Sequence, residues 1–474
     1  MSRERAPAPS LGLSLLPVLA LVALLAAFIG QLETSGHVPL VLATAVAGTV
    51  AMLGLGMPWK TLSAGMVAGI QSGLPAMMVL MVVGMLVGVW IAAGVVPVMI
   101  QYGLLLLSPS WFLVASCCIC AVVALATGSS WSTAATVGLA LVGVGSALDV
   151  DPGMTAGAII SGAYFGDKMS PLSDTTNLAP AAAGSELFEH IRHMLYTTVP
   201  ALLVSLVAFA VLGHAAGGLG SSGGSEVATI QRGIEAGFSL SPILLLPPGA
   251  VLVLVVCRVP ALPALLAGTL IAALLGVALQ GASVGDMAAA AYAGFESDTG
   301  VPGVDKLLSR GGMSSMMETI GLIVCALAFA GVMESSGMLH GLARAVLSKA
   351  RSPGTLVGAT ALSAIGLNVL AGDQYIAIIV PGRMYRTAYI ELRLHPKNLS
   401  RALEDSGTMT SPLVPWNTCG AYMASVLGVP TMAYLPFAFI NLLTPILTVI
   451  YGFTRITFDT LSEEEAEARL ALDP

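Results

Sequence analysis

The sequence predicts an all-α polytopic membrane protein with roughly 10 to 13 transmembrane helices, some of them broken or re-entrant. Hydrophobic residues make up 56% of the 474 positions and charged residues 9%, and the mean hydropathy is +0.89. Soluble domains carry about a quarter charged residues. Moreover, the segment from Thr61 to Leu148 contains no Asp, Glu, Lys or Arg, and about 20 apolar residues are enough to span a bilayer as a helix.

The predicted helices follow the apolar runs of the chain. The first run comes after Arg3 and Arg5 and resembles a signal sequence, but many more runs follow, so we interpret it as an uncleaved first helix. Several later runs are too long for one span and too short for two, which predicts broken helices. The runs lie at residues 11–30, 37–56, 74–96, 110–148, 153–182, 194–213, 241–257, 261–280, 315–333, 352–382 and 405–452.

The chain divides into two transmembrane halves. We predict a first half at 1–213, a Gly/Ser-rich connector at 214–240, a second half at 241–455 and an acidic C-terminal tail at 456–474. The connector contains a stretch of glycine and serine that is typical of flexible linkers. The tail carries four glutamates, which we interpret as a solvated end.

Basic residues predict the orientation. Eight of the 19 Lys and Arg fall in two clusters: Arg344, Lys349, Arg351, Arg383, Arg386, Arg393, Lys397 and Arg401. Basic loops stay on the cytoplasmic side of the inner (plasma) membrane. Residues 352–382 between the clusters must then enter the membrane and return to the same side, as a re-entrant hairpin broken near Gly372. Outside these loops there is no basic stripe, so the lipid bilayer is the expected partner and nucleic acid is not.

The two halves repeat a pattern of interruptions. Residues 127–130 (Thr-Gly-Ser-Ser) break one apolar run, and a Ser-Pro-Leu sequence follows at 170–172. Residues 371–374 (Ala-Gly-Asp-Gln) break a second run, and Ser-Pro-Leu follows at 411–413, at nearly the same distance. Paired Gly- and Pro-interrupted segments in corresponding halves are typical of transporters built from repeats.

The densest polar group in apolar surroundings lies at residues 166–177. Ionisable groups at membrane depth are costly and usually functional, so we predict that Asp167 and Asp174 bind H⁺ or Na⁺ and that Lys168 modulates their pKa. Na⁺ prefers oxygen ligands, and the candidate ligands are Asp167, Asp174, Thr175 and Thr176. The alternative is a polar loop just outside the membrane, in which Lys168 neutralises one of the two aspartates.

Asp373 is the corresponding carboxylate of the second half, because no other charge occurs from Ser352 to Pro381. Glu404 and Asp405 leave two interpretations open, a solvated helix start or part of a site. For His190 and His193 we prefer a solvated, charged helix entry over a pH sensor. The candidate substrate-binding residues are hydroxyl and amide side chains near the interruptions: Thr127, Ser129, Ser130, Ser173, Thr175, Thr176, Asn177, Asn368, Ser411, Asn417 and Thr418.

At these residues the chain resembles the NhaC family of Na⁺/H⁺ antiporters, whose wider group includes malate/lactate exchangers. The resemblance covers about residues 60–455 and is carried by three segments, 126–131, 156–180 and 411–418. It implies an inner-membrane exchanger with two inverted repeats and coupling carboxylates in the middle segment. It does not fix the substrate, because relatives exchange cations, carboxylates or amino acids.

The sequence therefore favours a secondary transporter that exchanges Na⁺ for H⁺, with no cofactor and no enzymatic activity. The alternative in the same class is a Na⁺- or H⁺-coupled exchanger of a small organic anion or amino acid. Two alternatives from other classes are a passive channel and an intramembrane aspartyl protease. The protease is disfavoured because the first glycine of a Gly-x-Gly-Asp motif is missing before both Asp167 and Asp373. A homodimer is left open.

Overall fold

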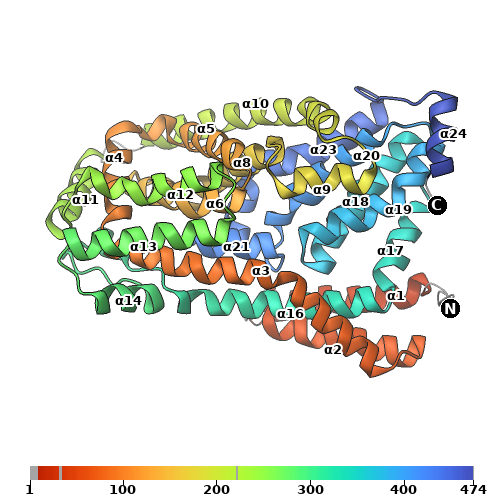
Figure 1. The fold of residues 1–474 in the computed structure, drawn as a ribbon, viewed down its shortest axis with the longest axis horizontal. Helices are drawn as coiled ribbons and strands as arrows, with labels where there is room; N and C mark the ends of the chain where they lie inside the picture. Colours follow the sequence, from red (N-terminus) through yellow and green to blue (C-terminus); the bar gives the residue numbers. More distant parts are fainter. Residues whose placement is uncertain (1–8, 31, 33–34, 220–222, 473–474) are drawn as a thin grey trace.

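All regular structure described by the computed structural model is helical (Figure 1). The description covers residues 9–30, 32, 35–219 and 223–472. Within these ranges, eight helices are long and apolar enough to cross a membrane, and counting two bent pairs as one span each raises the number to ten. The all-α polytopic prediction is confirmed, and this count meets the lower end of the predicted range.

The elements fall into three groups. The eight candidate spans are α1 (Leu11–Gly30), α2 (His37–Leu55), α3 (Trp59–Ala92), α5 (Pro109–Thr127), α10 (Leu187–Leu219), α13 (Ala261–Leu279), α16 (Met317–Ser335) and α18 (Pro353–Ala371). The bent pairs are α11 (Gly223–Gly237) with α12 (Leu246–Val256), at 99°, and α22 (Thr431–Tyr434) with α23 (Phe439–Thr454), at 58°. The other helices are α4 (Val95–Leu106), α6 (Ser130–Thr133), α7 (Leu139–Ala147), α8 (Pro152–Met169), α9 (Asp174–Ala183), α14 (Val284–Ala293), α15 (Pro302–Leu308), α17 (Met338–Leu347), α19 (Gln374–Glu391), α20 (Pro396–Leu403), α21 (Thr418–Leu427) and α24 (Glu463–Leu472).

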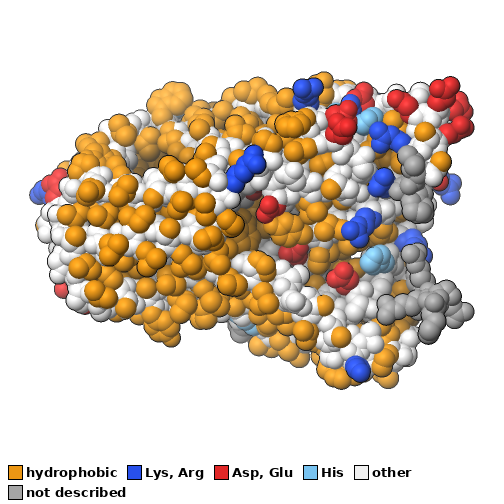
Figure 2. Space-filling view, in the orientation of Figure 1, with side chains coloured by type: hydrophobic (Ala, Val, Ile, Leu, Met, Phe, Trp, Pro, Cys, Tyr) orange, Lys and Arg blue, Asp and Glu red, His pale blue; other side chains and the backbone are white. Residues whose placement is uncertain are grey.

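Short turns of other helix types join some of these elements. The 3₁₀ turns are Pro242–Leu245, Met313–Met316, Ser411–Leu413 and Leu435–Phe437, and the π-helical turns are Ala134–Gly138 and Glu404–Thr408. Most long helices run along the long axis of the molecule (Figure 1). Apolar side chains cover much of the surface, and charged side chains gather at the end where the two termini lie (Figure 2).

The predicted interruptions are real helix ends. Helix α5 ends at Gly128 and α18 at Gly372, and both glycines have left-handed backbone conformations, with φ of 68° and 63°. Glycine adopts this conformation without the steric cost that a Cβ atom brings. Polar residues cap the helices that follow, Ser129 for α6 and Asp373 for α19.

The repeat extends beyond the first interruption of each half. The Ser-Pro-Leu sequences lead into two helices of ten residues, α9 and α21, which are capped by Ser173 and Asn417. These helices end at left-handed glycines, Gly184 and Gly428. The separation of these two glycines along the chain equals that of Gly128 and Gly372. The inverted orientation of the two repeats stays a prediction.

The predicted break near Gly372 is confirmed, because α18 ends there and α19 packs back against α18. In the predicted connector, α10 continues to Leu219 and α11 begins at Gly223, while residues 220–222 lie outside the described ranges. Part of the acidic tail forms α24, and Glu463 pairs with Arg393 across 2.9 Å. The division into two halves, connector and tail stays a prediction.

Replacing Gly128 with Ala should destabilise the protein more than the same change at Gly56. Both glycines have φ near +66°, so both variants incur the left-handed cost of about 1–2 kcal/mol. A Cβ at Gly128 would lie 2.7 Å from Leu172, whereas nothing lies within 4 Å of a Cβ at Gly56. Overpacking should therefore add about 1–3 kcal/mol at Gly128. Unfolding of the purified variants in detergent measures this difference. Equal losses of stability in the two variants would contradict the close approach of Gly128 to Leu172.

Candidate functional site

A cavity of about 400 Å³ lies where the interrupted helices of both halves meet α3 and the start of α13. Its lining is mixed, with carboxylate, hydroxyl and amide groups among apolar and aromatic side chains. The residues that line it are Ser72, Pro75, Ala76, Val79, Gly128, Ser129, Trp131, Asp167, Ser173, Asp174, Thr175, Ala261, Asp373, Gln374, Tyr375 and Thr418. Residues from both halves thus form one site.

Four helices begin at or beside this cavity: α6, α9, α19 and α21. Each is capped by a side chain that accepts backbone N–H groups of its first turn. The strongest cap is Asp373, whose Oδ1 accepts the N–H groups of Tyr375 at 2.9 Å and Ile376 at 3.1 Å. Helix N-termini carry a partial positive charge, so the cavity favours negatively charged groups at these positions.

Three aspartates supply that negative charge. Asp167, near the end of α8, is almost fully buried, and its Oδ2 accepts the backbone N–H of Ser130 at 3.0 Å and the hydroxyl of Ser130 at 2.6 Å. Asp174 is the first residue of α9 and is exposed, and Asp373 is buried. The predicted carboxylates of the two halves therefore lie around one cavity.

The predicted residues of the second half also hold its interruption in place. The N–H of Thr418 donates to the carbonyl of Gly372 at 2.8 Å. Asn417 donates through Nδ2 to Oδ1 of Asn368 at 3.1 Å, and Asn368 in turn donates to the carbonyl of Gly407 at 2.6 Å. Thr418 lines the cavity, whereas Asn368 and Asn417 are not among its lining residues and hold the break through these hydrogen bonds.

Several predicted binding residues are not part of the cavity wall. Thr176 donates its hydroxyl to the carbonyl of Lys168 at 3.0 Å, and Asn177 donates to the carbonyl of Ser173 at 2.7 Å. Ser411 donates to the carbonyl of Thr408 at 2.7 Å. These side chains stabilise the ends of the broken helices. Thr127 and Ser130 also lie outside the wall, although Ser130 contacts Asp167 directly.

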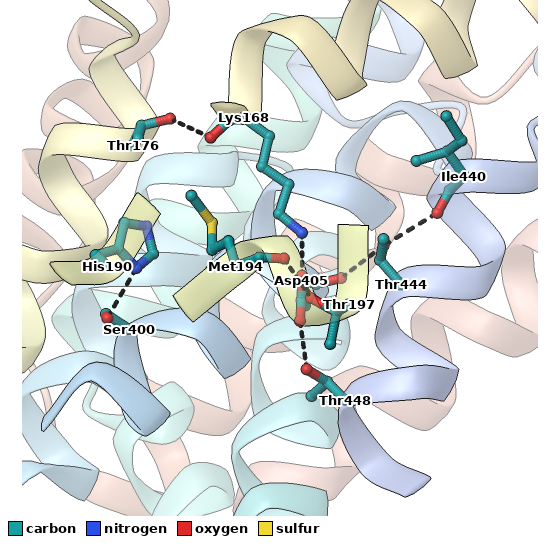
Figure 3. A network of polar contacts seen from close by, with 10 residues as sticks. All are labelled: Lys168, Thr176, His190, Met194, Thr197, Ser400, Asp405, Ile440, Thr444 and Thr448. Carbon is teal, nitrogen blue, oxygen red and sulfur yellow. Dashed lines mark hydrogen bonds and ion pairs between the residues drawn. The ribbon is translucent and has the colours of Figure 1, made fainter. Parts of the chain in front are cut away.

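The structure gives Lys168 an ion-pair partner that neither sequence interpretation named. Its ammonium group forms an ion pair with Asp405 instead of Asp167 or Asp174, and both partners are fully buried. The hydroxyls of Thr197 and Thr448, from α10 and α23, also donate to Asp405 (Figure 3). Lys168 and Asp405 are 237 positions apart in the sequence, so the pattern around Lys168 carried no sign of this partner.

Two groups for which a solvated position was one of the interpretations are buried. Glu404 and Asp405 lie in a π-helical turn with no exposed surface, so a solvated helix start is wrong for both. His190 and His193 are also buried, and the predicted solvated entry is wrong there as well. The reason is that α20 packs against α10. His190 Nδ1 lies 2.8 Å from the hydroxyl of Ser400.

The cavity includes residues that the sequence did not single out. Trp131 lines it and stacks on Tyr422 of α21, with ring centroids 4.0 Å apart and ring planes at 15°. The hydroxyl of Tyr422 donates to the carbonyl of Trp131 at 2.9 Å. Trp131 directly follows the Thr-Gly-Ser-Ser interruption, so its position in the sequence could have indicated that it lies at the site. Ser72 of α3 stands just before the apolar run at 74–96, and Pro75, Ala76 and Val79 lie within it, so these residues gave no such signal.

Replacing Lys168 with Met should destabilise the protein by about 3–5 kcal/mol, because Asp405 would remain as an uncompensated buried charge. Adding Asp405→Leu should restore most of that loss, since replacing both partners of a buried pair is often near neutral. The partly exposed pair of Lys397 and Asp459 is a matched control, at which Lys397→Met should cost about 1 kcal/mol or less. Unfolding in detergent tests all three variants, and a double variant as unstable as Lys168→Met would contradict the pairing.

Comparison with known proteins gives matches over nearly the whole chain. The sequence model of the Na+/H+ antiporter family matches residues 8–164 and 162–456. The Na(+)/H(+) antiporter NhaC of Alkalihalophilus pseudofirmus is 39% identical over 94% of this chain and 96% of its own length. The arginine/ornithine antiporter ArcD of Halobacterium salinarum is 40% identical, over 94% of this chain and 92% of its own. The malate-2H(+)/Na(+)-lactate antiporter of Bacillus subtilis is 36% identical, over 88% and 89%.

These matches confirm the resemblance drawn from the three sequence segments. Together with the apolar helices, they identify a multi-pass protein of the plasma membrane that acts as a transporter rather than an enzyme. The chain belongs to the Na⁺/H⁺ antiporter family.

Proposed function

We propose that this protein exchanges Na⁺ for protons across the plasma membrane and that the cavity binds both ions. The observation that carries the proposal is the meeting of three aspartates from two halves around one cavity. Two relatives, from Alkalihalophilus pseudofirmus and Bacillus subtilis, are named Na(+)/H(+) antiporter NhaC and are 39% and 38% identical.

The cavity offers the ligands that a hard monovalent cation prefers. Asp167, Asp174 and Thr175 belong to its wall, and their side chains carry carboxylate and hydroxyl oxygens. We place Na⁺ between these groups. Thr176, a predicted fourth ligand, donates its hydroxyl to the carbonyl of Lys168, so it acts by holding the turn. A carbonyl or hydroxyl of the second half would complete the oxygen shell that such ions require.

Exchange follows from competition for the same oxygens. A carboxylate that binds a proton loses the charge that attracts Na⁺, and a carboxylate that binds Na⁺ no longer attracts a proton. Ser130 restrains Asp167 through two hydrogen bonds to one oxygen, so it fixes the position of the carboxylate without neutralising it. Alternate loading of this site from the two membrane faces would couple the two gradients.

Everted vesicles test the proposal through dissipation of a preformed pH gradient after separate additions of Na⁺, K⁺ and Li⁺, from mildly acidic to alkaline pH. We expect Na⁺ to release protons from vesicles that contain the natural protein. Asp167→Asn and Asp174→Asn should reduce this signal to that of vesicles without the protein, because each removes a charged ligand from the cavity.

Asp151→Asn is the matched control for these variants. Asp151 caps the opposite end of α8, where its Oδ1 accepts the N–H of Met154 at 2.9 Å. Asn caps helices as well as Asp does, so this variant should keep full exchange. Undiminished exchange in Asp174→Asn would contradict the assignment of that residue.

The test also separates the second candidate, an exchanger of a small organic solute. Relatives named for arginine/ornithine and for malate and lactate favour it, and a cavity of about 400 Å³ falls in the size range of small-molecule sites. However, none of the described residues that line the cavity is Lys or Arg, which disfavours a dianion. If the natural protein responds to none of the three cations, exchange of labelled malate and of labelled amino acids is the next measurement.

A further inference from the structure

A second cavity, of about 410 Å³, lies beside the C-terminal end of α21. Its wall includes Val87 of α3, Arg310 and Met316 of the segment between α15 and α16, and Ser425 and Gly428 at the end of α21. Among the described residues that line it, Arg310 is the only one with an ionisable side chain. The exchange proposed above does not use this cavity.

The second cavity is separate from the first but shares two helices with it. The lining residues of α3 change from Val79 to Val87, and those of α21 change from Thr418 to Ser425. At 1.5 Å per residue, this is a shift of about 10–12 Å along each helix. Helix α3 runs away from the end that carries the two termini (Figure 1), so the second cavity lies farther from the charged end than the first.

The guanidinium group of Arg310 lies at the wall of this second cavity. Its Nη2 donates to the carbonyl of Val426 at 3.0 Å. Gly428 faces the same group, because a Cβ at this glycine would lie 3.1 Å from Nη2. Since Val426 and Gly428 both line the cavity, the charged end of Arg310 is at the wall together with them.

The positive charge of Arg310 has no counter-charge among the described residues. A guanidinium has five N–H donors, and the bond to Val426 is the only hydrogen bond of this side chain within the described ranges, where no carboxylate pairs with it. Asp305, five positions earlier, accepts instead from the hydroxyls of Ser297 and Thr299, at 2.9 and 2.8 Å. A charge in a protein interior is costly without a partner, so the cavity attracts an anion.

Capping of α21 accounts for only part of this arrangement. Basic side chains that bond the last carbonyls of a helix stabilise its C-terminal end, and the contact with Val426 has this role. It uses one donor of five, however, and the C-terminal end of a helix carries only about half a negative charge. Both the remaining donors and the remaining charge are therefore available to a ligand.

We infer that the second cavity binds a small monocarboxylate anion. The planar fork of a guanidinium matches a carboxylate, and the side chains of Val87 and Met316 offer apolar surface to a short hydrocarbon chain. One fixed positive charge neutralises one negative charge, so a dianion would leave a charge unmatched. The volume falls in the size range of small-molecule sites. This inference does not depend on the ion that the first cavity carries.

Thiol labelling of Ser425→Cys in membrane vesicles tests the site, with propionate as the probe. Ser425 lines the second cavity, and a neutral thiol reagent with site-resolved mass spectrometry separates this cysteine from the six natural ones. Sodium propionate should slow the labelling of Ser425→Cys at concentrations at which sodium chloride does not. Ser314→Cys is the matched control, because Ser314 is exposed and is not among the lining residues; its labelling should not respond to propionate.

Propionamide separates recognition of charge from simple filling of the cavity. It has nearly the shape of propionate but no charge, so it should not protect Ser425→Cys. Equal protection by propionamide would overturn the role of Arg310, and equal protection by chloride would overturn the assignment to a carboxylate. An absence of protection by propionate would overturn the site itself.

Substitution of Arg310 in the Ser425→Cys protein gives the second readout. Arg310→Gln should raise the concentration of propionate that halves the labelling rate by roughly 10- to 100-fold, the value of a hydrogen bond to a charged group. Arg310→Lys keeps the charge and should raise it less. Lys306→Gln removes a positive charge at an exposed position of α15 and should leave it unchanged. An unchanged concentration in a folded Arg310→Gln protein would contradict the inference. If this variant does not fold, the comparison of propionate with propionamide decides.

Discussion

The structure depends on the cost of ending a helix inside apolar surroundings. A helix that stops there leaves backbone C=O groups, and a helix that starts there leaves backbone N–H groups, that no water can satisfy. Ser129, Ser173, Asp373 and Asn417 meet this requirement by capping the four helices that begin inside the protein. Such ends have to be enclosed by protein, so the chain packs its interruptions against one another. The cavity results from that enclosure, with polar groups concentrated where the helices start.

The same arrangement determines the electrostatics of the site. Four helix starts would make the centre of the protein positive, and three aspartates offset that charge. The balance leaves carboxylate groups around a small space, and no Lys or Arg stands among the described residues of the wall, so an exchangeable cation meets no fixed positive charge there. Lys168 stays out of this balance because Asp405 neutralises it behind the wall. Asp373 combines two roles, because it caps α19 and also lines the cavity, whereas Asp167 and Asp174 line the cavity without being helix N-caps.

The interruptions were predictable from sequence because their signals are local. Glycine followed by Ser or Asp, and Ser-Pro-Leu followed by a capping residue, mark helix ends within a few positions. Partners far apart in the chain were not predictable. No residue near Lys168 in the sequence indicated Asp405 as its partner. The basic loop before Glu404 has the composition of a solvated segment, and only the structure shows that α10 packs against α20, which leads into Glu404. The contribution of α3 was not predictable for another reason, since its cavity residues lie in or just before the apolar run at 74–96 and no charged residue marks them.

The stack of Trp131 on Tyr422 has a consequence for movement between the two membrane faces. One ring belongs to the first half and the other to the second, and a hydrogen bond ties them together. Parting them would cost about 0.5–1.5 kcal/mol for the stack and about 1 kcal/mol for the bond. At 1.4 kcal/mol per tenfold change, the parted conformation is disfavoured by roughly one to two orders of magnitude. An ion that shifts the equilibrium toward the parted conformation would have to bind that conformation more tightly than the closed one by the same factor. The ion that binds the parted conformation best would also populate it most, so ion selectivity and the probability of opening would increase together.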